Sequence, residues 1–471
     1  MAGRMKTPWM AIAALVVTCA AAAARPPAPD PTLALPLGHS GRWLTDALGR
    51  VVLVHGVNFV EKAAPFYPAA RGFGDDDAAF LAAHGFNAFR LGVVPEALMP
   101  APGVVDLGYV EQLAASVDVL AAHGILVVLD FHQVGWGPAT FGNGMPVWAT
   151  ITDGAPNPPA EFPLYYIQNP SIQHAFDHFW ANSVGPDGVG LQVHYAAAVH
   201  AVAERFKADP HVLGYEAMNE PWPGTVWRPC IEGCPDLEAK LLVPFYRRLA
   251  RAVHAATRRQ FLFGEPFVLF NFGHADTALP RIGAPRDGLA VHVYALSEAE
   301  DLAAIDHAVA AAEQSGEALL VTEWGATSDG PTITRQAAQF DGRLAPWLFW
   351  AYYAELIRDP AAPPTPGNLN ADAVAALTRP FPVATNGTPT SFAFDPVART
   401  LAFTYAVHQP NGRPSRAGIE TVVAMPAPVY PSGYTTSASG AFVLSPPDAP
   451  QLRVRNAPGA TTVAIHARPR Q

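Results

Sequence analysis

The chain has 471 residues, half of which are apolar, and its formal net charge is −10. This length and composition allow a large hydrophobic core, predict one large domain with a smaller one, and exclude a largely disordered chain. Lysine and arginine residues are scattered and form no basic run, so we expect no nucleic-acid partner.

The first 24 residues have the pattern of a secretory signal peptide. Arg4 and Lys6 precede the apolar run Trp9–Cys19, and alanines follow in the form of an A-x-A cleavage site. We therefore expect an exported protein. A retained membrane anchor is the alternative, although the apolar run is short for a membrane span. Residues 25–40 include a proline-rich stretch and are interpreted as a spacer.

From residue 41 to residue 378 the sequence alternates between predicted helices and apolar strands. Asp75–His84 begins with three aspartates and is followed by Gly85, which are signals for the start and the end of a helix. The order of helix, His-Gly and strand then occurs a second time, at residues 109–129. The predicted helices are Asp75–His84, Tyr109–His123, Val193–Lys207, Leu242–Arg259 and Glu298–Gln314.

Eight apolar segments are predicted to be core strands. They are Arg50–Val57, Phe86–Leu91, Ile125–Leu129, Val212–Met218, Phe261–Phe263, Leu289–Tyr294, Ala318–Thr322 and Trp347–Tyr353. Strands without a polar face are typical of a parallel sheet covered by helices. We therefore predict an α/β fold in which residues 41–378 form a (β/α)8 TIM barrel, with its chemistry at the carboxyl ends of the strands.

A long segment between the third and fourth predicted strands, Val134–Gly190, has no regular pattern. It is rich in glycine, proline and aromatic residues. Because it is longer than an ordinary connection, we interpret it as a lid or a binding loop.

From about Arg379 the composition and the hydrophobic pattern of the sequence change. Short alternating segments are separated by proline, glycine and asparagine, so residues 379–471 are predicted to form a small C-terminal β-sandwich that has no site of its own. The segments are Phe392–Phe394, Arg399–Val407, Gly418–Val423 and Gly440–Val443. Asn386-Gly387-Thr388 fits a glycosylation acceptor, although this motif is frequent by chance.

Cys230 and Cys234 are the only cysteines after the predicted signal peptide. In an oxidising compartment, two thiols four residues apart favour a local disulfide, with free thiols as the alternative. A zinc site would need further ligands nearby.

Glu220 and Glu323 each follow a predicted strand. An isolated Asn-Glu-Pro such as residues 219–221 most often only caps a turn, but here a second glutamate lies at the end of another strand. A retaining glycosidase needs two such carboxyl groups about 5–5.5 Å apart, one protonated and one ionised. Arg90 and Tyr294 are expected to hold Glu323 ionised and oriented, since a positive charge and donated hydrogen bonds lower a carboxyl pKa.

Four further residues at strand ends are expected to bind the substrate. Asn219 is placed to bind the sugar hydroxyl next to the anomeric carbon, and His132 to bind another hydroxyl. Trp350 offers an apolar face to a sugar ring. His292 lies at the same end of the predicted barrel.

Seven short motifs resemble glycoside hydrolase family 5, in clan A. They are HGVN at 55–58, RLGV at 90–93, FHQ at 131–133, MNEPWPG at 218–224, VHVY at 291–294, TEWG at 322–325 and FWAYY at 349–353. Two longer strings, at residues 55–68 and 141–154, and the trailing β-sandwich resemble the endoglycoceramidase subgroup.

This resemblance implies hydrolysis, with retention, of the β-bond between a glycan and ceramide. It implies that Glu220 is the acid/base, Glu323 the nucleophile, and that Lys62 lies near the sugar. Many members follow FHQ with an aspartate, whereas this chain has Val134, so the preferred sugar stays open. We expect no cofactor and no metal, because the sixteen histidines have no metal-binding spacing.

A lipid substrate would need an apolar groove and would bring the protein to a membrane surface. The candidates for the groove are Trp136, Met145, Trp148, Trp222, Trp227, Phe267, Phe270 and Phe272, and the alternative for each is an ordinary core residue.

The alternative activity is the release of a single glucose or galactose from a lipid, a sterol or a β-glucan. The non-enzymatic alternative is an inactive carbohydrate-binding surface protein. The sequence leaves the oligomeric state open.

Overall fold

The computed structural model describes residues 32–273, 276–277, 279, 281–284, 286–295 and 297–470. Residues from Thr32 onward form one compact unit. The predicted signal peptide and the start of the predicted spacer lie outside the described residues.

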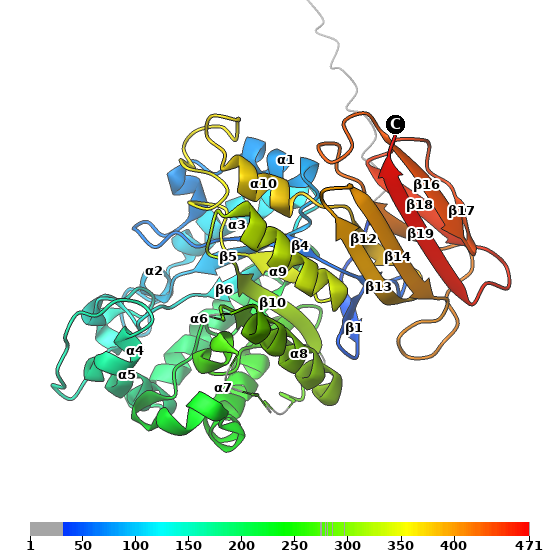
Figure 1. The fold of residues 1–471 in the computed structure, drawn as a ribbon. Coiled ribbons are helices and arrows are strands. Elements are labelled where there is room, and N and C mark those ends of the chain that lie inside the picture. Colours follow the sequence, from blue (N-terminus) through cyan, green and yellow to red (C-terminus); the bar gives the residue numbers. More distant parts are fainter. Residues whose placement is uncertain are drawn as a thin grey trace, which may run out of the picture. The chain divides into compact units, whose positions relative to one another are not determined.

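The core of this unit is a closed barrel of eight parallel strands (Figure 1). In barrel order the strands are β4 (His55–Phe59), β5 (Ala88–Val93), β6 (Leu126–Phe131), β7 (Val212–Glu216), β8 (Phe261–Gly264), β9 (Asp287–Val293), β10 (Ala318–Trp324) and β11 (Trp347–Phe349). Every residue of these strands is buried, which explains their almost continuous apolar sequences. The predicted TIM barrel is confirmed.

Helices follow the strands around the barrel. They are α1 (Asp75–Ala83), α2 (Pro95–Leu98), α3 (Leu107–Ala122), α6 (Leu191–Phe206), α7 (Pro235–Ala256), α8 (Glu298–Ser315), α9 (Gly330–Gly342) and α10 (Ala371–Leu377). The five predicted helices are present, although α7 begins seven residues earlier than predicted. Side chains cap several helix starts: Asp106 accepts a hydrogen bond from the Tyr109 N–H, and Ser297 accepts one from the Glu300 N–H.

The segment Val134–Gly190 is more ordered than predicted. It contains α4 (Tyr165–Gln168) and α5 (Pro170–Trp180), and the Asn169 side chain caps α5. The apolar face of α5 is buried, with Phe176 and Phe179 fully covered. The segment therefore has a packed interior of its own, which a flexible lid would lack.

The C-terminal part contains two antiparallel sheets, as predicted. One is four-stranded, in the order β13 (Thr388–Asp395), β14 (Thr400–Ala406), β19 (Thr462–Pro469) and β16 (Tyr434–Ser439). The other is seven-stranded, in the order β1 (Gly38–Ser40), β2 (Trp43–Thr45), β3 (Val51–Val52), β12 (Phe381–Thr385), β15 (Glu420–Ala424), β18 (Gln451–Asn456) and β17 (Ala441–Val443).

The start of the described chain therefore belongs to the C-terminal sheet. β1 lies inside the predicted spacer, and the predicted first core strand is divided into β3, which pairs with β12, and the barrel strand β4. Residues 51–55 contain no turn residue at which a strand would end, so the sequence did not reveal that the first of them pair with a strand more than 300 positions away.

The barrel and the C-terminal sheets share a buried ion pair. Both Arg379 Nε and Nη2 donate to Asp341 Oδ2, at 3.0 and 2.7 Å, and Asp341 Oδ1 lies 3.4 Å from Nε2 of His55. The His55 ring is stacked against Trp347 and Phe381, with centroid distances of 4.1 and 3.8 Å. These contacts connect β4 and α9 of the barrel to β12.

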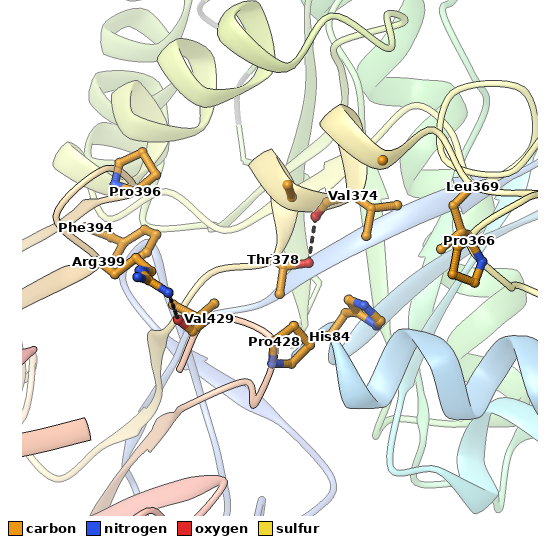
Figure 2. Close-up of a pocket in the computed structure, with 12 residues that line it drawn as sticks. His84, Pro366, Leu369, Val374, Thr378, Phe394, Pro396, Arg399, Pro428 and Val429 are labelled. Atoms are coloured by element: carbon orange, nitrogen blue, oxygen red, sulfur yellow. Dashed lines mark hydrogen bonds between the residues drawn. The ribbon is translucent and has the colours of Figure 1, made fainter. Parts of the chain in front are cut away.

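A cavity of about 430 Å³ lies near this junction, between α10, the end of α1 and the C-terminal sheets (Figure 2). Its lining is mainly apolar and includes Leu369, Val374 and Phe394, with the exposed guanidinium of Arg399 at one side. None of the predicted site residues lines it.

The structure argues against glycosylation of Asn386. The residue is 2% exposed, and its Nδ2 donates hydrogen bonds to the carbonyl oxygens of Arg416 and Ile419. The motif is thus a buried structural asparagine. Among the described residues, no helix has the length and apolarity to cross a membrane.

Candidate active site

The predicted site residues gather at the carboxyl end of the barrel. Arg90, His292 and Glu323 lie in β5, β9 and β10, and Asn219 and Glu220 follow β7. The remaining residues come directly after strands or in the loop after β4; they are Lys62, His132, Tyr294 and Trp350. Because β7 is the fourth and β10 the seventh strand of the barrel, the two glutamates approach each other from different sides of its mouth.

Arg90 lies at the centre of the site and is fully buried. Its Nε donates to Glu216 Oε2 at 2.5 Å, its Nη1 to Glu323 Oε1, and its Nη2 to Asn219 Oδ1 at 2.8 Å. Nη2 is also 3.0 Å from Asp130 Oδ1. Burial lowers the pKa of Arg90, but the surrounding carboxylates outweigh this and raise that pKa well above its ordinary value. Arg90 is therefore a permanent cation at the floor of the site.

Glu323 receives hydrogen bonds on both oxygens. Arg90 donates to Oε1, and the Tyr294 hydroxyl donates to Oε2 at 2.9 Å. Both side chains that the sequence analysis assigned to Glu323 therefore contact it.

Glu220 has an unusual backbone and a one-sided set of contacts. Its φ is 45°, in the left-handed region, which costs of order 1–3 kcal/mol for a residue with a side chain. Its Oε1 accepts hydrogen bonds from Asn271 Nδ2 at 2.7 Å and from His292 Nδ1 at 3.0 Å. Among the described residues, none donates to its Oε2.

The two glutamates are close together. One oxygen of Glu220, one oxygen of Glu323 and a nitrogen of His292 all lie within 4.8 Å of one another. His292 Nδ1 is 3.5 Å from Glu323 Oε2, so the same ring nitrogen faces both carboxyl groups. A bond placed between these groups is accessible to both.

A second group of residues forms the side of the site. His132 Nδ1 is 2.7 Å from Asp130 Oδ2, which fixes the ring, and its buried Nε2 has no hydrogen-bond partner among the described residues. The ring is stacked on Trp350 at 5.7 Å, and Lys62 Nζ lies 4.8 Å from the centroid of the Trp350 ring. Burial and the nearby cation of Lys62 lower the pKa of His132 well below its ordinary value. A neutral imidazole nitrogen and an ammonium are thus available to hydroxyl groups beside an aromatic face.

Two family models match the chain. The model of the cellulases (glycosyl hydrolase family 5) matches residues 66–355, and that of the glycoside hydrolase family 5 C-terminal domain matches residues 379–466. The chain belongs to glycosyl hydrolase family 5. The protein is therefore a glycosidase, and the resemblance noted in the sequence is confirmed.

Individual relatives place this family 5 protein in the endoglycoceramidase-like subgroup. Endoglycoceramidase I of Rhodococcus hoagii (strain 103S) is 32% identical over 455 residues, which cover 90% of this chain and 87% of the relative. Endo-glycoceramidase II from Rhodococcus sp. has been solved as a lactosyl-enzyme intermediate, with 26% identity and a TM-score of 0.74, and as a ganglioside GM3 complex, with 25% identity and a TM-score of 0.73. These structures cover 91% of this chain, which in turn covers 100% and 99% of theirs.

Most residues that were predicted to line an apolar groove are instead buried in the core of this family 5 protein. Five of its eight candidates are core residues that are at most 2% exposed: Trp136, Met145, Trp222, Phe267 and Phe270. Trp136, for example, packs against Phe176 and Phe179 of α5, and Trp222 is stacked on Tyr166. These five residues therefore belong to the core. The other three candidates, Trp148, Trp227 and Phe272, are partly exposed.

Four residues of the site were not predicted. Asp130, Glu216 and Glu265 are buried carboxyl groups around Arg90, and Asn271 lies in the 3-10 helix Val268–Phe272. The carboxyl groups have a signal in the sequence, because each interrupts or directly follows an apolar strand. Asn271 has none, since it is 51 residues away from the glutamate that it contacts.

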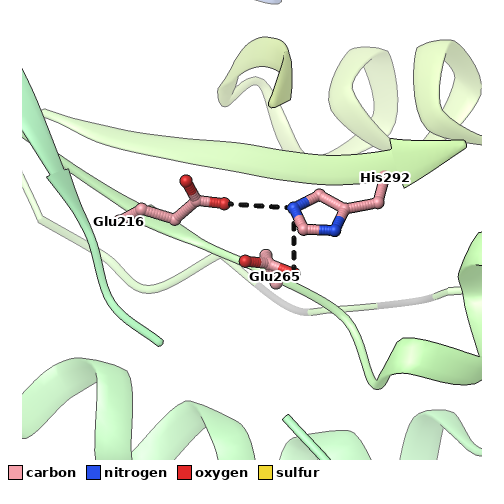
Figure 3. Close-up of side chains that lie close together, drawn as sticks. All are labelled: Glu216, Glu265 and His292. Carbon is pink, nitrogen blue, oxygen red and sulfur yellow. Dashed lines mark ion pairs between the residues drawn. The ribbon is translucent and has the colours of Figure 1, made fainter. Parts of the chain in front are cut away.

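Glu216, Glu265 and His292 lie close enough together to resemble a metal site (Figure 3). His292 Nε2 is 3.7 Å from Glu216 Oε1 and 3.6 Å from Glu265 Oε2. Burial lowers the pKa of His292, but Glu265 and Glu323 outweigh this and raise that pKa well above its ordinary value. A histidine must be neutral to bind a metal, so an imidazolium paired with carboxyl groups describes this cluster better. The expectation that the protein needs no cofactor stays a prediction.

The predicted disulfide is present. Cys230 and Cys234 are bonded, with a Cα–Cα distance of 4.6 Å. The bridge closes the loop after Glu220, between the 3-10 helix Gly224–Val226 and α7.

Proposed function

We propose that this glycosidase hydrolyses the bond between the glycan and the ceramide of glycosphingolipids, with retention of configuration. The observation that carries the proposal is the separation of the two carboxyl groups, whose nearest oxygens lie within 4.8 Å. Retaining glycosidases keep these groups about 5–5.5 Å apart, whereas inverting enzymes need about 6.5–9.5 Å to admit a water molecule. The pair thus favours direct attack by one carboxylate.

In the first step Glu323 attacks the anomeric carbon. The bond from this carbon to the ceramide oxygen breaks, an ester to Glu323 forms, and Glu220 gives its proton to the leaving oxygen. Arg90 and Tyr294 donate to the two oxygens of Glu323 and orient it for the attack. In the second step Glu220 removes a proton from water, and the water oxygen attacks the anomeric carbon. The bond from this carbon to Glu323 breaks, which releases the glycan and restores the Glu323 carboxylate.

The contacts of Glu220 support its proposed role as the acid. Asn271 and His292 both donate to Oε1, so this oxygen serves as an acceptor. The proton is then carried by Oε2, which receives no hydrogen bond from the described residues and is free to meet the leaving group. The two hydrogen bonds thus orient the Glu220 carboxyl group and leave Oε2 for the proton transfer.

Four residues are proposed to bind the sugar next to the scissile bond. His132 Nε2 and Lys62 meet hydroxyl groups, while Trp350 packs against the ring. Asn219 already accepts from Arg90 and donates to the Gln133 carbonyl oxygen, so its second N–H is the group available to a hydroxyl.

The ceramide part of the proposal rests on the relatives, whose names describe endoglycoceramidases, and on the ganglioside GM3 complex of one of them. A lipid substrate would bring the protein to a membrane surface. We also propose that residues 1–24 direct export. The disulfide supports this, because such bonds persist in oxidising compartments.

The test is a product analysis by mass spectrometry with mixed gangliosides and simple glucosides. The wild-type protein is expected to release intact oligosaccharide and ceramide. Glu323→Gln should bind the substrate without turnover, while the control Glu317→Gln, at the opposite end of β10, should retain turnover. Release of single sugars only, or normal turnover by Glu323→Gln, would overturn the proposal.

A further inference from the structure

We infer that Glu265 is a positioning residue for the acid/base Glu220, and that it acts as a neutral carboxylic acid. This inference rests on the proposed function of Glu220. Glu265 directly follows β8, is 1% exposed, and is not among the residues assigned above to the chemistry or to sugar binding. Its own backbone is held in place, because the Tyr246 hydroxyl donates to its carbonyl oxygen at 2.6 Å.

Glu265 holds Glu220 by its backbone. Its Oε2 accepts a hydrogen bond from the Glu220 N–H at 3.1 Å, and Gln133 Nε2 donates to the Glu220 carbonyl oxygen at 2.9 Å. Both sides of the left-handed residue are thus fixed by buried side chains. A strained backbone conformation persists only where its surroundings impose it, so loss of Glu265 should let Glu220 relax and move its carboxyl group.

Glu265 also holds Glu220 through a second residue. Its Oε2 lies 3.6 Å from His292 Nε2 (Figure 3). The other nitrogen of this ring donates to Glu220 Oε1. The backbone of the acid/base and the donor that orients its side chain therefore meet at one carboxyl oxygen. This is the arrangement expected of a residue that fixes a catalytic group without touching the substrate.

The charges around Glu265 favour its protonated form. Two buried cations, Arg90 and His292, face five carboxyl groups at the centre of the site, which are Asp130, Glu216, Glu220, Glu265 and Glu323. Lys62 and the hydroxyl groups of Tyr246 and Tyr294 complete the titratable surroundings. In the proposed mechanism Glu323 is ionised and Glu220 is protonated. Burial raises the pKa of Asp130 well above its ordinary value, so one further carboxylate balances the two buried cations.

Glu216 is that further carboxylate. Burial raises its pKa, but Arg90 at 2.5 Å outweighs this, and the pKa lies below its ordinary value. Glu265 lies farther from Arg90, at 3.9 Å, and burial raises its pKa well above the ordinary value, an effect that His292 offsets only in part. Glu265 Oε1 accepts no hydrogen bond from the described residues and is the oxygen left to carry the proton.

The inference predicts different effects on kcat for two substitutions of Glu265. In Glu265→Gln the amide oxygen can still accept from the Glu220 N–H, and the amide nitrogen replaces the protonated oxygen. This variant should keep kcat within about fivefold of the wild type. Glu265→Ala removes both groups, and kcat for a glycoside with a poor leaving group should fall about 100-fold, the effect of misplacing a catalytic group, with KM changed less than about threefold.

The leaving group provides the decisive readout. The dinitrophenolate of a dinitrophenyl β-glycoside leaves without receiving a proton. Glu265→Ala should therefore form the glycosyl-enzyme from this substrate at nearly the wild-type rate, as measured by the pre-steady-state burst. The matched control is Glu317→Ala. Glu317 is also buried and accepts a backbone N–H, from Ile282 at 3.3 Å, but it lies at the other end of the barrel. This control should leave kcat per folded molecule unchanged for both glycosides.

Two results would overturn the inference. One is an equal loss for both glycosides in Glu265→Ala, which would indicate general damage to the site. The other is a Glu265→Gln variant as inactive as Glu265→Ala, with the alkaline limb of its pH profile shifted, which would show that Glu265 acts as a charged partner of His292. If instead Glu220→Ala itself retained activity on the poor leaving group, the proposed function would fail, whatever Glu265 does.

Discussion

The charge balance of the site depends on one residue, Arg90. Its guanidinium, which is not exposed to solvent, contacts Glu216, Glu323, Asn219 and Asp130. A planar group with five donors can serve such partners at once, which the single ammonium of lysine cannot. Arg90 thus connects the stability of the barrel mouth to the orientation of Glu323, the proposed nucleophile.

Replacement of Arg90 by methionine should destabilise the protein as well as stop turnover. It leaves buried carboxylates without a partner, and breaking a buried ion pair in this way costs about 3–5 kcal/mol of unfolding free energy. The control is Arg343→Met, because Arg343 makes a similar two-point contact with Asp306 at the surface, where about 0–1 kcal/mol is expected. Urea unfolding at neutral pH measures both, and equal losses would contradict the account.

Sequence reasoning found the site residues whose position reveals their chemistry. Glu220, Glu323, His132 and Trp350 could be found because strand ends of a barrel face one another. Asn271 could not be found in this way. It lies in a 3-10 helix rather than at a strand end, and no sequence pattern predicts that this helix contacts Glu220. The protonation of a group such as Glu265 is equally hidden, since it depends on charges from other strands.

At the scale of elements, β4, α9 and β12 meet at the Asp341–Arg379 pair. Burial lowers the pKa of His55, an effect that Asp341 offsets only in part. Burial raises the pKa of Asp341, but Arg379 outweighs this and the pKa is lowered. Both shifts mean that the folded protein binds fewer protons here than the unfolded chain in acid.

The contribution of this cluster to the stability of the protein should therefore fall on acidification. The unfolded chain protonates histidine below about pH 6.5, while His55 stays neutral in the fold, so unfolding takes up a proton and becomes easier as the pH falls. The contribution of Asp341 is present above about pH 4 and is lost below it. Urea titrations between pH 7.5 and 4 of the wild type and of variants at these two residues measure this contribution to the unfolding free energy.

Two variants identify the groups responsible. His55→Phe keeps the aromatic stack with Trp347 and Phe381, and should reduce the slope between pH 6.5 and 4 by at most about 1.4 kcal/mol per pH unit, the effect of one proton. Asp341→Asn should lower stability at neutral pH and narrow its difference from the wild type in acid. A His55→Phe curve parallel to that of the wild type would exclude the histidine.

The elements that sequence reasoning missed have ambiguous starts. Asp329-Gly330-Pro331 reads as a turn, yet Asp329 caps α9 by accepting a hydrogen bond from the Thr332 N–H. Asn169-Pro170 likewise starts α5. The barrel strands were found because burial on both faces makes them apolar throughout, which is a local property, whereas the pairing of β3 with β12 is not.

At the scale of the whole molecule, the C-terminal sheets close the amino end of the barrel. Side chains from the barrel interior, such as Leu126 and Leu348, belong to one continuous apolar cluster with side chains of these sheets, such as Phe392 and Val454. The first described strands, β1 to β3, extend the same sheet. The two parts therefore share a core.

A chain that ends at residue 378 should not fold stably. It would leave β3 without its partner β12 and expose the shared cluster to water, at about 25 cal/mol for each Å² of apolar surface. The control is a chain that starts at Thr32, which keeps the whole compact unit and should unfold at the temperature of the full chain. Solubility and thermal unfolding compare the two, and a soluble truncated barrel with an unchanged midpoint would contradict a shared core.

The most direct test of the account is to trap the glycosyl-enzyme. A 2-fluoro β-glycoside with an activated leaving group forms the ester quickly and hydrolyses it slowly, so peptide mapping by mass spectrometry can locate the sugar. We predict one sugar per chain, on the peptide that contains Glu323. A sugar on another residue, or rapid turnover without a covalent adduct and with inversion at the anomeric carbon, would contradict the mechanism.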